Sequence, residues 1–163
     1  MGYPNQDELS RAKCSLAAEV VRKHGRLRLR VTGLSMLPAV WPGNIVTVAR
    51  QEPAHVLPGE LVLVEHEGGL RLHRLVARQR SPEIDHLVTR GDSLSADDPP
   101  VRPEQVLGVV TSIQRGGRAL APQRSASKLA WLFSHSYLRA WTAWIALHSR
   151  ALVARKETLR IVS

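Results

Sequence analysis

The chain has 163 residues, of which 44% are hydrophobic and 23% charged, proportions typical of a globular protein rather than a disordered one. A single cysteine excludes an internal disulfide, so the fold depends on packing, as in a reducing compartment. The formal net charge of +9 is spread along the chain, without a lysine-rich tract or the aromatic and basic pattern that stacks bases, which argues against nucleic-acid binding.

Short apolar runs and turn signals alternate through most of the chain. Residues 7–24 are predicted to form an amphipathic helix, because apolar residues recur at helical spacing and Gly25 is placed to end it. A strand follows at 26–31, where apolar residues alternate with arginines. Further strands are predicted between turn signals, at 45–49, 61–64, 70–76, 84–89 and 106–113. The series predicts a mainly β fold, an antiparallel coiled or barrel-like sheet with one helix at each end.

The sequence changes in character after Gly116-Gly117. Residues 119–128 are predicted to form a loop and 129–154 an amphipathic helix. Its apolar face carries four large aromatic residues, Phe133, Tyr137, Trp141 and Trp144. Such a face packs on the protein's own core, on a second copy or at a membrane interface, and the sequence leaves these open. Arg139 and Arg150 argue against a full membrane span.

Three segments follow from these patterns. They are an N-terminal helix at 1–25, a central β domain at 26–118 and a C-terminal amphipathic appendage at 119–163. Charged residues are spread through the first segment, so neither a secretory signal nor an N-terminal membrane span is expected there.

Ser35 is the first candidate for chemistry. It lies in Gly33-Leu34-Ser35-Met36-Leu37-Pro38, directly after the first predicted strand. A serine on a tight turn behind a glycine suits a nucleophile, although a plain turn serine has the same pattern. A serine hydroxyl is a weak nucleophile by itself, so the interpretation requires a base.

His73 is the candidate base. Strand alternation puts Arg71, His73 and Leu75 on one face of the predicted strand 70–76. Imidazole has an unperturbed pKa of about 6.5 and can accept a serine proton near neutral pH. The alternative is an ordinary histidine on a strand surface.

A carboxylate-rich loop follows at 89–100. It contains Asp92, Asp97 and Asp98 among glycine, serine and proline residues. One of these carboxylates could fix the tautomer of a catalytic imidazole, or the loop could be a solvated turn. Because the spacing fits no EF-hand or other ligand pattern, no metal site is expected.

The ordered motifs G-x-S-M-x-P, L-H-R-L-V and T-R-G-D-x-x-x-x-D-D resemble the signal peptidase I and LexA-like serine peptidase superfamily. The resemblance runs from Val31 to Ile113 and includes two Pro-Gly boxes, at 42–46 and 58–62. No lysine occurs between Lys23 and Lys128, so the Ser-Lys dyad of most relatives cannot form. A histidine stands at the lysine position, as in the archaeal and endoplasmic-reticulum type of signal peptidase.

The resemblance implies a serine endopeptidase with Ser35 as nucleophile and His73 as general base. An aspartate of the Gly-Asp box completes such a site, and Asp92 and Asp98 are the two candidates at matching positions. We expect Asp98 to partner the histidine and Asp92 to order the surrounding loop.

The oxyanion in this family is held beside the nucleophile. Gly33 stands where many signal peptidases carry a hydroxyl, so the backbone N–H of Ser35 is expected to do more, with Met36, Thr32 and Gly33 as supporting residues. Two further departures are Asn44 in place of the usual aspartate of the first Pro-Gly box and the expected lack of an N-terminal membrane anchor.

The expected function is removal of a signal or leader segment from a protein or peptide precursor through an acyl-enzyme, without cofactor or metal. The expected location is the cytoplasm, with association with the inner membrane face left open. One alternative is a non-catalytic basic module that binds a membrane surface or a partner protein through 129–154. The other is a LexA-like self-cleaving peptidase, although 1–34 contain no Ala-Gly or Cys-Gly bond.

Overall fold

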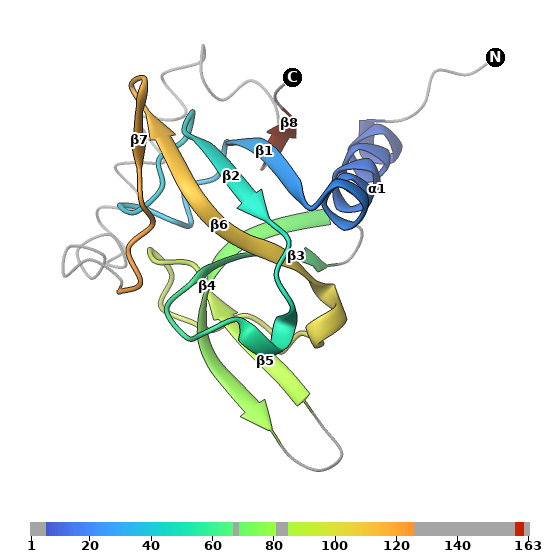
Figure 1. Cartoon of the computed structure of the whole chain (residues 1–163), viewed down its shortest axis with the longest axis vertical. Helices are drawn as coiled ribbons and strands as arrows, with labels where there is room; N and C mark the ends of the chain where they lie inside the picture. The colour runs from blue at the N-terminus through green and yellow to red at the C-terminus, as the bar shows by residue number, and fades with distance from the viewer. Residues whose placement is uncertain (1–5, 67–68, 81–84, 126–158, 162–163) are drawn as a thin grey trace.

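The computed structural model describes residues 6–66, 69–80, 85–125 and 159–161. One α-helix and eight strands lie in these ranges, with two short 3-10 helices between them (Figure 1). In chain order they are α1 (Gln6–His24), β1 (Arg26–Val31), β2 (Ile45–Ala49), η1 (Pro53–His55), β3 (Leu61–His66), β4 (Gly69–Arg80), β5 (Asp85–Arg90), η2 (Pro103–Gln105), β6 (Val106–Arg115), β7 (Arg118–Leu120) and β8 (Leu159–Ile161).

The predicted mainly β fold is confirmed, and each of the six predicted strands is present. The largest difference in length is at β4, which continues to Arg80 and forms a long hairpin with β5. β7 begins at Arg118 and lies partly in the segment predicted as a loop. The predicted helix at 129–154 lies outside the described residues.

The strands form one antiparallel sheet in the order β5-β4-β3-β6-β2-β1-β8, with β7 paired to β6. The expectation of a barrel-like sheet was wrong, because among the described strands β5 and β8 end the order and do not pair with each other. Register shifts in three pairings, at Thr47/Val48, Leu63/Val64 and Leu75/Ala77, mark bulges. Bulges bend and coil a sheet, and here they do so without closing it.

β3 lies inside the sheet, between β4 and β6, and is buried on both faces. Leu61 and Leu63 belong to one apolar cluster, whereas Val62 and Val64 belong to a second. The alternation of side chains along a strand sends successive residues to opposite faces, so both faces of β3 require cover. This explains its unbroken apolar run.

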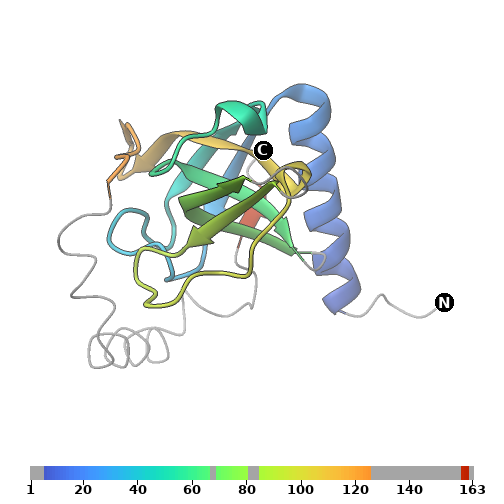
Figure 2. The same ribbon diagram turned by 90° about the horizontal axis from the view of Figure 1, so that it is seen from below.

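α1 covers one face of the sheet (Figure 2). Ala17, Ala18 and Val21 are buried in the same cluster as Leu61 and Leu63. The helix therefore contributes to the core of the β domain. Neither α1 nor the 3-10 helices combine the length and apolar character needed to cross a membrane, and this holds for every helix in the described ranges.

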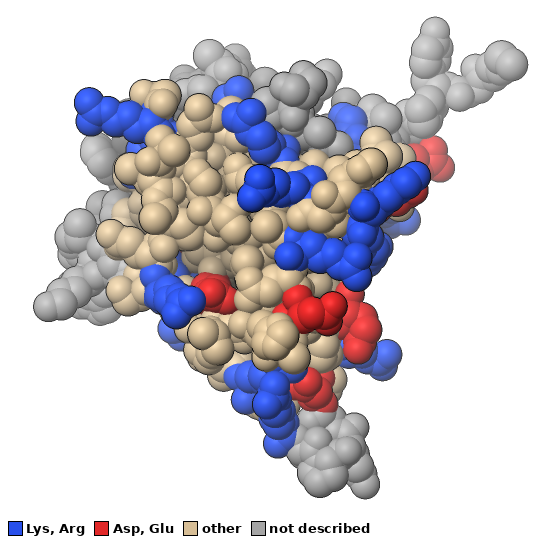
Figure 3. Space-filling view, in the orientation of Figure 1, with Lys and Arg blue, Asp and Glu red and all other residues tan. Residues whose placement is uncertain are grey.

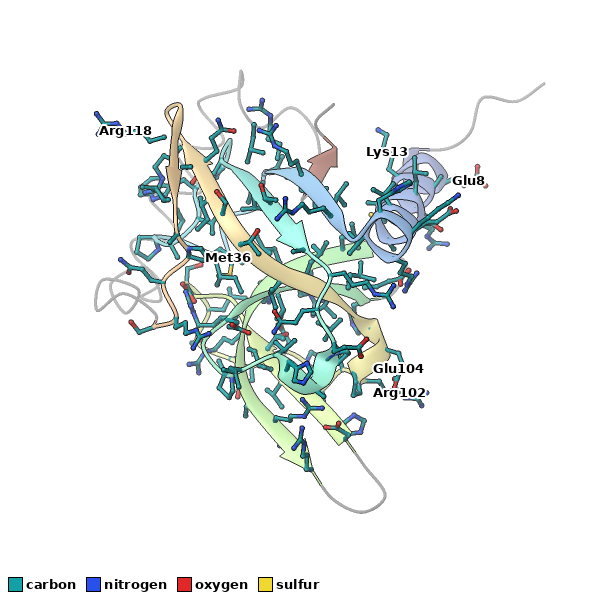
Figure 4. The ribbon with its side chains drawn as sticks, viewed as in Figure 1. Glu8, Lys13, Met36, Arg102, Glu104 and Arg118 are labelled. Carbon is teal, nitrogen blue, oxygen red and sulfur yellow. The ribbon has the colours of Figure 1, made fainter. Side chains whose placement is uncertain are left out.

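The basic side chains are distributed over the surface. In Figure 3, lysine and arginine side chains lie in several places on this face, and acidic side chains lie among them mainly in its lower half. Arg118 projects outward from the β6–β7 hairpin (Figure 4). The formal net charge is thus not concentrated at a single site on this face.

Candidate active site

Ser35 lies in the turn that follows β1. Backbone hydrogen bonds from Val31 N to Asn44 O (2.9 Å) and from Gly43 N to Val31 O (2.7 Å) close the base of this loop. Met36 is almost fully buried and lies in the interior beside β6 (Figure 4). The loop is thus anchored on both sides of Ser35 while the serine itself stays partly exposed.

The loop that contains Asp92 and Asp98 contacts the Ser35 loop from the other side. The Ser93 backbone N–H donates to Ser35 O (2.9 Å), and the Ser93 hydroxyl donates to Leu34 O (3.0 Å). A Cβ at Gly91 would lie 2.7 Å from Ser35 O, so the two loops are too close for a larger residue there. Glycine at this position permits the close approach of the backbones.

His73 lies on β4, opposite Val62 of β3. Its ring is only 4% exposed, so it is more enclosed than a residue on an open strand surface. Its Nε2 is 3.0 Å from Ser35 Oγ, and its Nδ1 is 2.5 Å from Asp98 Oδ2. The fold thus brings together three predicted residues that are 25 or more positions apart in sequence.

The tautomer of His73 follows from its neighbours. An ionised carboxylate accepts hydrogen bonds and donates none, so Nδ1 carries the proton that is shared with Asp98. In the neutral ring, Nε2 then has a free lone pair and accepts the hydrogen bond of the Ser35 hydroxyl. This is the arrangement in which imidazole can remove the serine proton.

Asp98 is held by several donors. Thr89 Oγ1 donates to Asp98 Oδ2 (2.6 Å), and the Asp98 backbone N–H donates to Thr89 O (2.8 Å). Arg71 NH1 lies 3.4 Å from the other carboxylate oxygen. These contacts orient the carboxylate toward His73.

Asp92 does not contact the His73 ring through a hydrogen bond but pairs with the next residue of β4. Arg74 donates from Nε and NH2 to the two carboxylate oxygens of Asp92, both at 2.7 Å. Arg74 also donates from NH1 to Gly59 O (2.6 Å) and Gln123 O (2.7 Å). This buried ion pair joins β4 to the loop that contacts Ser35.

The electrostatics of His73 combine two opposing effects. Burial lowers the pKa of His73 below its ordinary value, because a charged ring is poorly solvated there. The hydrogen bond and the negative charge of Asp98 act in the opposite direction, but burial dominates. The ring is therefore neutral at neutral pH, which is the form that can act as a base.

A cavity of about 250 Å³ opens beside Ser35 and His73. It lies between the end of β1 and the first residues of β4. Arg71, two residues before His73 on β4, is one of its lining residues. Apolar side chains and glycines line most of the rest, namely Val31, Gly33, Met36, Gly69, Leu70 and Leu72. A chain segment in this cavity would lie directly against the Ser35 hydroxyl.

A second cavity, of about 920 Å³, is larger but lies elsewhere. Charged residues of both signs line it, including Arg78, Asp85, Arg102 and Glu104. Arg78 and Asp85 pair with each other at 2.6 Å, so their charges are largely satisfied within the protein. None of the predicted site residues lines this cavity.

The expected oxyanion residues differ in their placement. Gly33, Ser35 and Met36 line the cavity, whereas Thr32 does not. Thr32 Oγ1 is buried and has no hydrogen-bond partner among the described residues. The backbone around Ser35 is thus better placed than the Thr32 hydroxyl to face a bound carbonyl.

Sequence reasoning missed the roles of four residues, Arg71, Arg74, Thr89 and Ser93. A signal existed for Arg74, because an arginine among apolar residues in a central strand requires a buried partner. No comparable signal existed for Thr89 or Ser93, whose contacts depend on how the loops pack. The motifs contain Arg74, Thr89 and Ser93, and Arg71 directly precedes one of them, but they do not indicate the partners of these residues.

The described residues contain no metal-binding group, and the comparisons with known families and curated proteins gave no match. Among the residues described, no group of three or more His, Cys, Asp or Glu side chains is placed to hold a metal ion. No family model matches the chain, and no curated protein matches it.

Proposed function

We propose that this chain is a serine endopeptidase, similar to the histidine-using signal peptidases, that removes a signal or leader segment from a protein or peptide precursor. The observation that supports this most is the continuous hydrogen-bonded series Ser35–His73–Asp98 beside a cavity. The motif resemblance, which depends on the sequence alone, points to Ser35 and His73 and offers Asp92 and Asp98 as candidates for the third residue, with Asp98 expected.

The proposed reaction begins at the Ser35 hydroxyl. Its Oγ attacks the scissile carbonyl carbon as the proton moves to His73 Nε2, 3.0 Å away. Asp98 stabilises the resulting imidazolium through Nδ1–H. Collapse of the tetrahedral intermediate breaks the C–N bond, and His73 gives the proton to the leaving amine. Water, deprotonated by His73, then hydrolyses the Ser35 ester.

The edge of β4 supports an extended substrate. Residues Gly69–Arg74 pair with β3 on one side, but β5 begins to pair with β4 only at Arg74. The segment 69–73 therefore has no β5 partner beside the cavity. Unpaired main-chain groups of this kind can bind an extended chain as an added strand.

The proposal is tested by cleavage of candidate precursors encoded beside the gene, with cut sites located by mass spectrometry. Ser35→Ala and His73→Ala should each lower kcat by at least about 10⁴-fold, because nucleophile and base act as a unit. Full activity in the His73→Ala variant would show that the base is misassigned.

Labelling by a fluorophosphonate provides a readout that needs no substrate. The unmodified chain should be labelled at Ser35, and His73→Ala should be labelled far more slowly. Exposed Ser95, in the loop beyond Asp92, provides the matched control: Ser95→Ala should be labelled at the rate of the unmodified chain. Absence of labelling would contradict the proposal.

A further inference from the structure

Strand β8 lies along β1 (Figures 1 and 2). The pairing is antiparallel, with Leu29 opposite Ile161, Arg30 opposite Arg160 and Val31 opposite Leu159. Val31 precedes Ser35 by four residues and lines the cavity that contains Ser35 and His73. β8 thus begins, at Leu159, opposite the residue of β1 that lines this cavity.

β8 occupies the second edge of β1. The first edge is bonded to β2 along Arg26–Arg30. Val31 turns its backbone N–H and C=O toward the β2 side, where they bond Asn44 O and Gly43 N. Because these groups alternate between the two sides of a strand, those of Arg30 face β8, opposite Arg160.

The cavity beside Ser35 is bounded by two strands, β1 through Val31 and β4 through Gly69–His73. A substrate strand that passes Ser35 gains main-chain hydrogen bonds only from edges that are free. The β4 edge has no β5 partner at 69–73, whereas the β1 edge pairs with β8. β8 therefore occupies the outer edge of the strand that leads into the cavity.

We propose that Leu159–Ile161 is an autoinhibitory strand, which a precursor must displace from β1 in order to bind. The proposal rests on the proposed peptidase function. β8 is short and pairs with β1 alone among the described strands, so its displacement costs few hydrogen bonds. A substrate that competes for the edge binds with an apparent affinity reduced by the fraction of chains in which the edge is free.

The test uses the full chain with Arg160→Pro. Proline removes the Arg160 backbone N–H from the side facing Arg30. Arg160→Ala keeps that N–H and is the matched control. Arg118→Pro places the same change in β7, a short strand paired to β6 whose residues do not line the Ser35 cavity.

Three measurements are compared: hydrogen exchange at the Arg30 amide, fluorophosphonate labelling of Ser35, and turnover of a library of unstructured decapeptides followed by mass spectrometry. Arg160→Pro should speed exchange at Arg30 and raise kcat/KM about tenfold, mainly through KM. Labelling should be unchanged, because the small probe needs no strand edge. Both control variants should behave as the unmodified chain.

The outcomes separate the two proposals. Equal labelling with equal peptide turnover in Arg160→Pro and the unmodified chain would overturn autoinhibition alone. Equal exchange at Arg30 would also overturn it, because β8 would then not hold the edge. Faster turnover in Arg160→Ala as well would assign the effect to the side chain and overturn the strand mechanism. No labelling of Ser35 in any variant would overturn the peptidase function itself.

Discussion

His73 is the residue on which the proposed chemistry depends. It is enclosed by β3, the Ser35 loop and the loop that contains Asp92 and Asp98, and its two ring nitrogens have different partners. Burial favours the neutral ring and Asp98 favours the protonated ring, and the proposed reaction requires both forms. The same balance fixes the expected pH dependence.

Activity should persist into weakly acidic solution. The base works when neutral, and protonation inactivates it as pH falls through the pKa of His73, which burial holds below 6.5. A profile of kcat/KM against pH should therefore decline on the acid side below pH 6.5, with unit slope. Half-maximal activity above pH 6.5 would contradict this prediction.

Asp98→Asn should lower kcat by about 10³–10⁴-fold, because the amide no longer enforces the productive tautomer or stabilises the imidazolium. The acid limb of kcat/KM should also move to lower pH, since Asp98 raises the pKa of His73 and the amide does not. Both effects are read from pH-dependent cleavage kinetics.

Asp97 is the matched control for Asp98. It lies in the same loop, is exposed and pairs with Arg90 at 3.3 Å rather than with His73. Asp97→Asn should leave both kcat and the pH profile unchanged. An equal loss in the two variants would mean that the loop, and not the Asp98 carboxylate, is responsible.

At the scale of elements, the Arg74–Asp92 pair joins β4 to the loop that contacts Ser35. Both side chains are almost fully buried, with 6% and 2% of their areas exposed. Arg74 also satisfies two carbonyl groups, so a single side chain ties four segments together. Such a pair specifies how the loops meet more than it adds to stability.

Arg74→Met should destabilise the fold by about 3–5 kcal/mol, because it leaves the Asp92 carboxylate buried and unpaired. Urea unfolding followed by circular dichroism measures the change. Arg90→Met removes a pair that is about half exposed and should change the unfolding midpoint little. Equal midpoints for the two variants would contradict the structural role of Arg74.

At the scale of the whole molecule, two apolar clusters share one sheet. Leu63 is buried in the cluster beneath α1, and Leu87 in the cluster on the other side of β3. Because β3 contributes to both, we expect α1 and the strands to unfold as one cooperative unit.

Leu63→Ala and Leu87→Ala should each cost about 2–5 kcal/mol. Each should shift a single unfolding transition that is the same by circular dichroism and by hydrogen exchange at amides of both clusters. Leu57→Ala, at a position that is 47% exposed, is the control and should have little effect. Separate transitions for the two probes would mean that the clusters belong to independent units.

The sequence predicted the strands well because alternation is a local property. The arginines and leucines of β1 and the apolar run of β3 have one consistent extended conformation, whatever lies around them. It failed on closure of the sheet, because bulges and register between distant strands determine whether ends meet. It could not predict β8, because these three residues form a strand by pairing with the distant strand β1.

By itself, the sequence determined which residue types were available for chemistry: a serine in a tight turn, a histidine between two arginines of a strand and a loop of aspartates. Both Asp92 and Asp98 occupied positions of the family's motif, so the sequence left two candidates for the partner of the histidine. The tertiary structure decided their partners, with Asp98 beside His73 and Asp92 beside Arg74. Adjacent residues of β4 point to opposite faces, so the fold, and not the motif, determines which carboxylate each one meets.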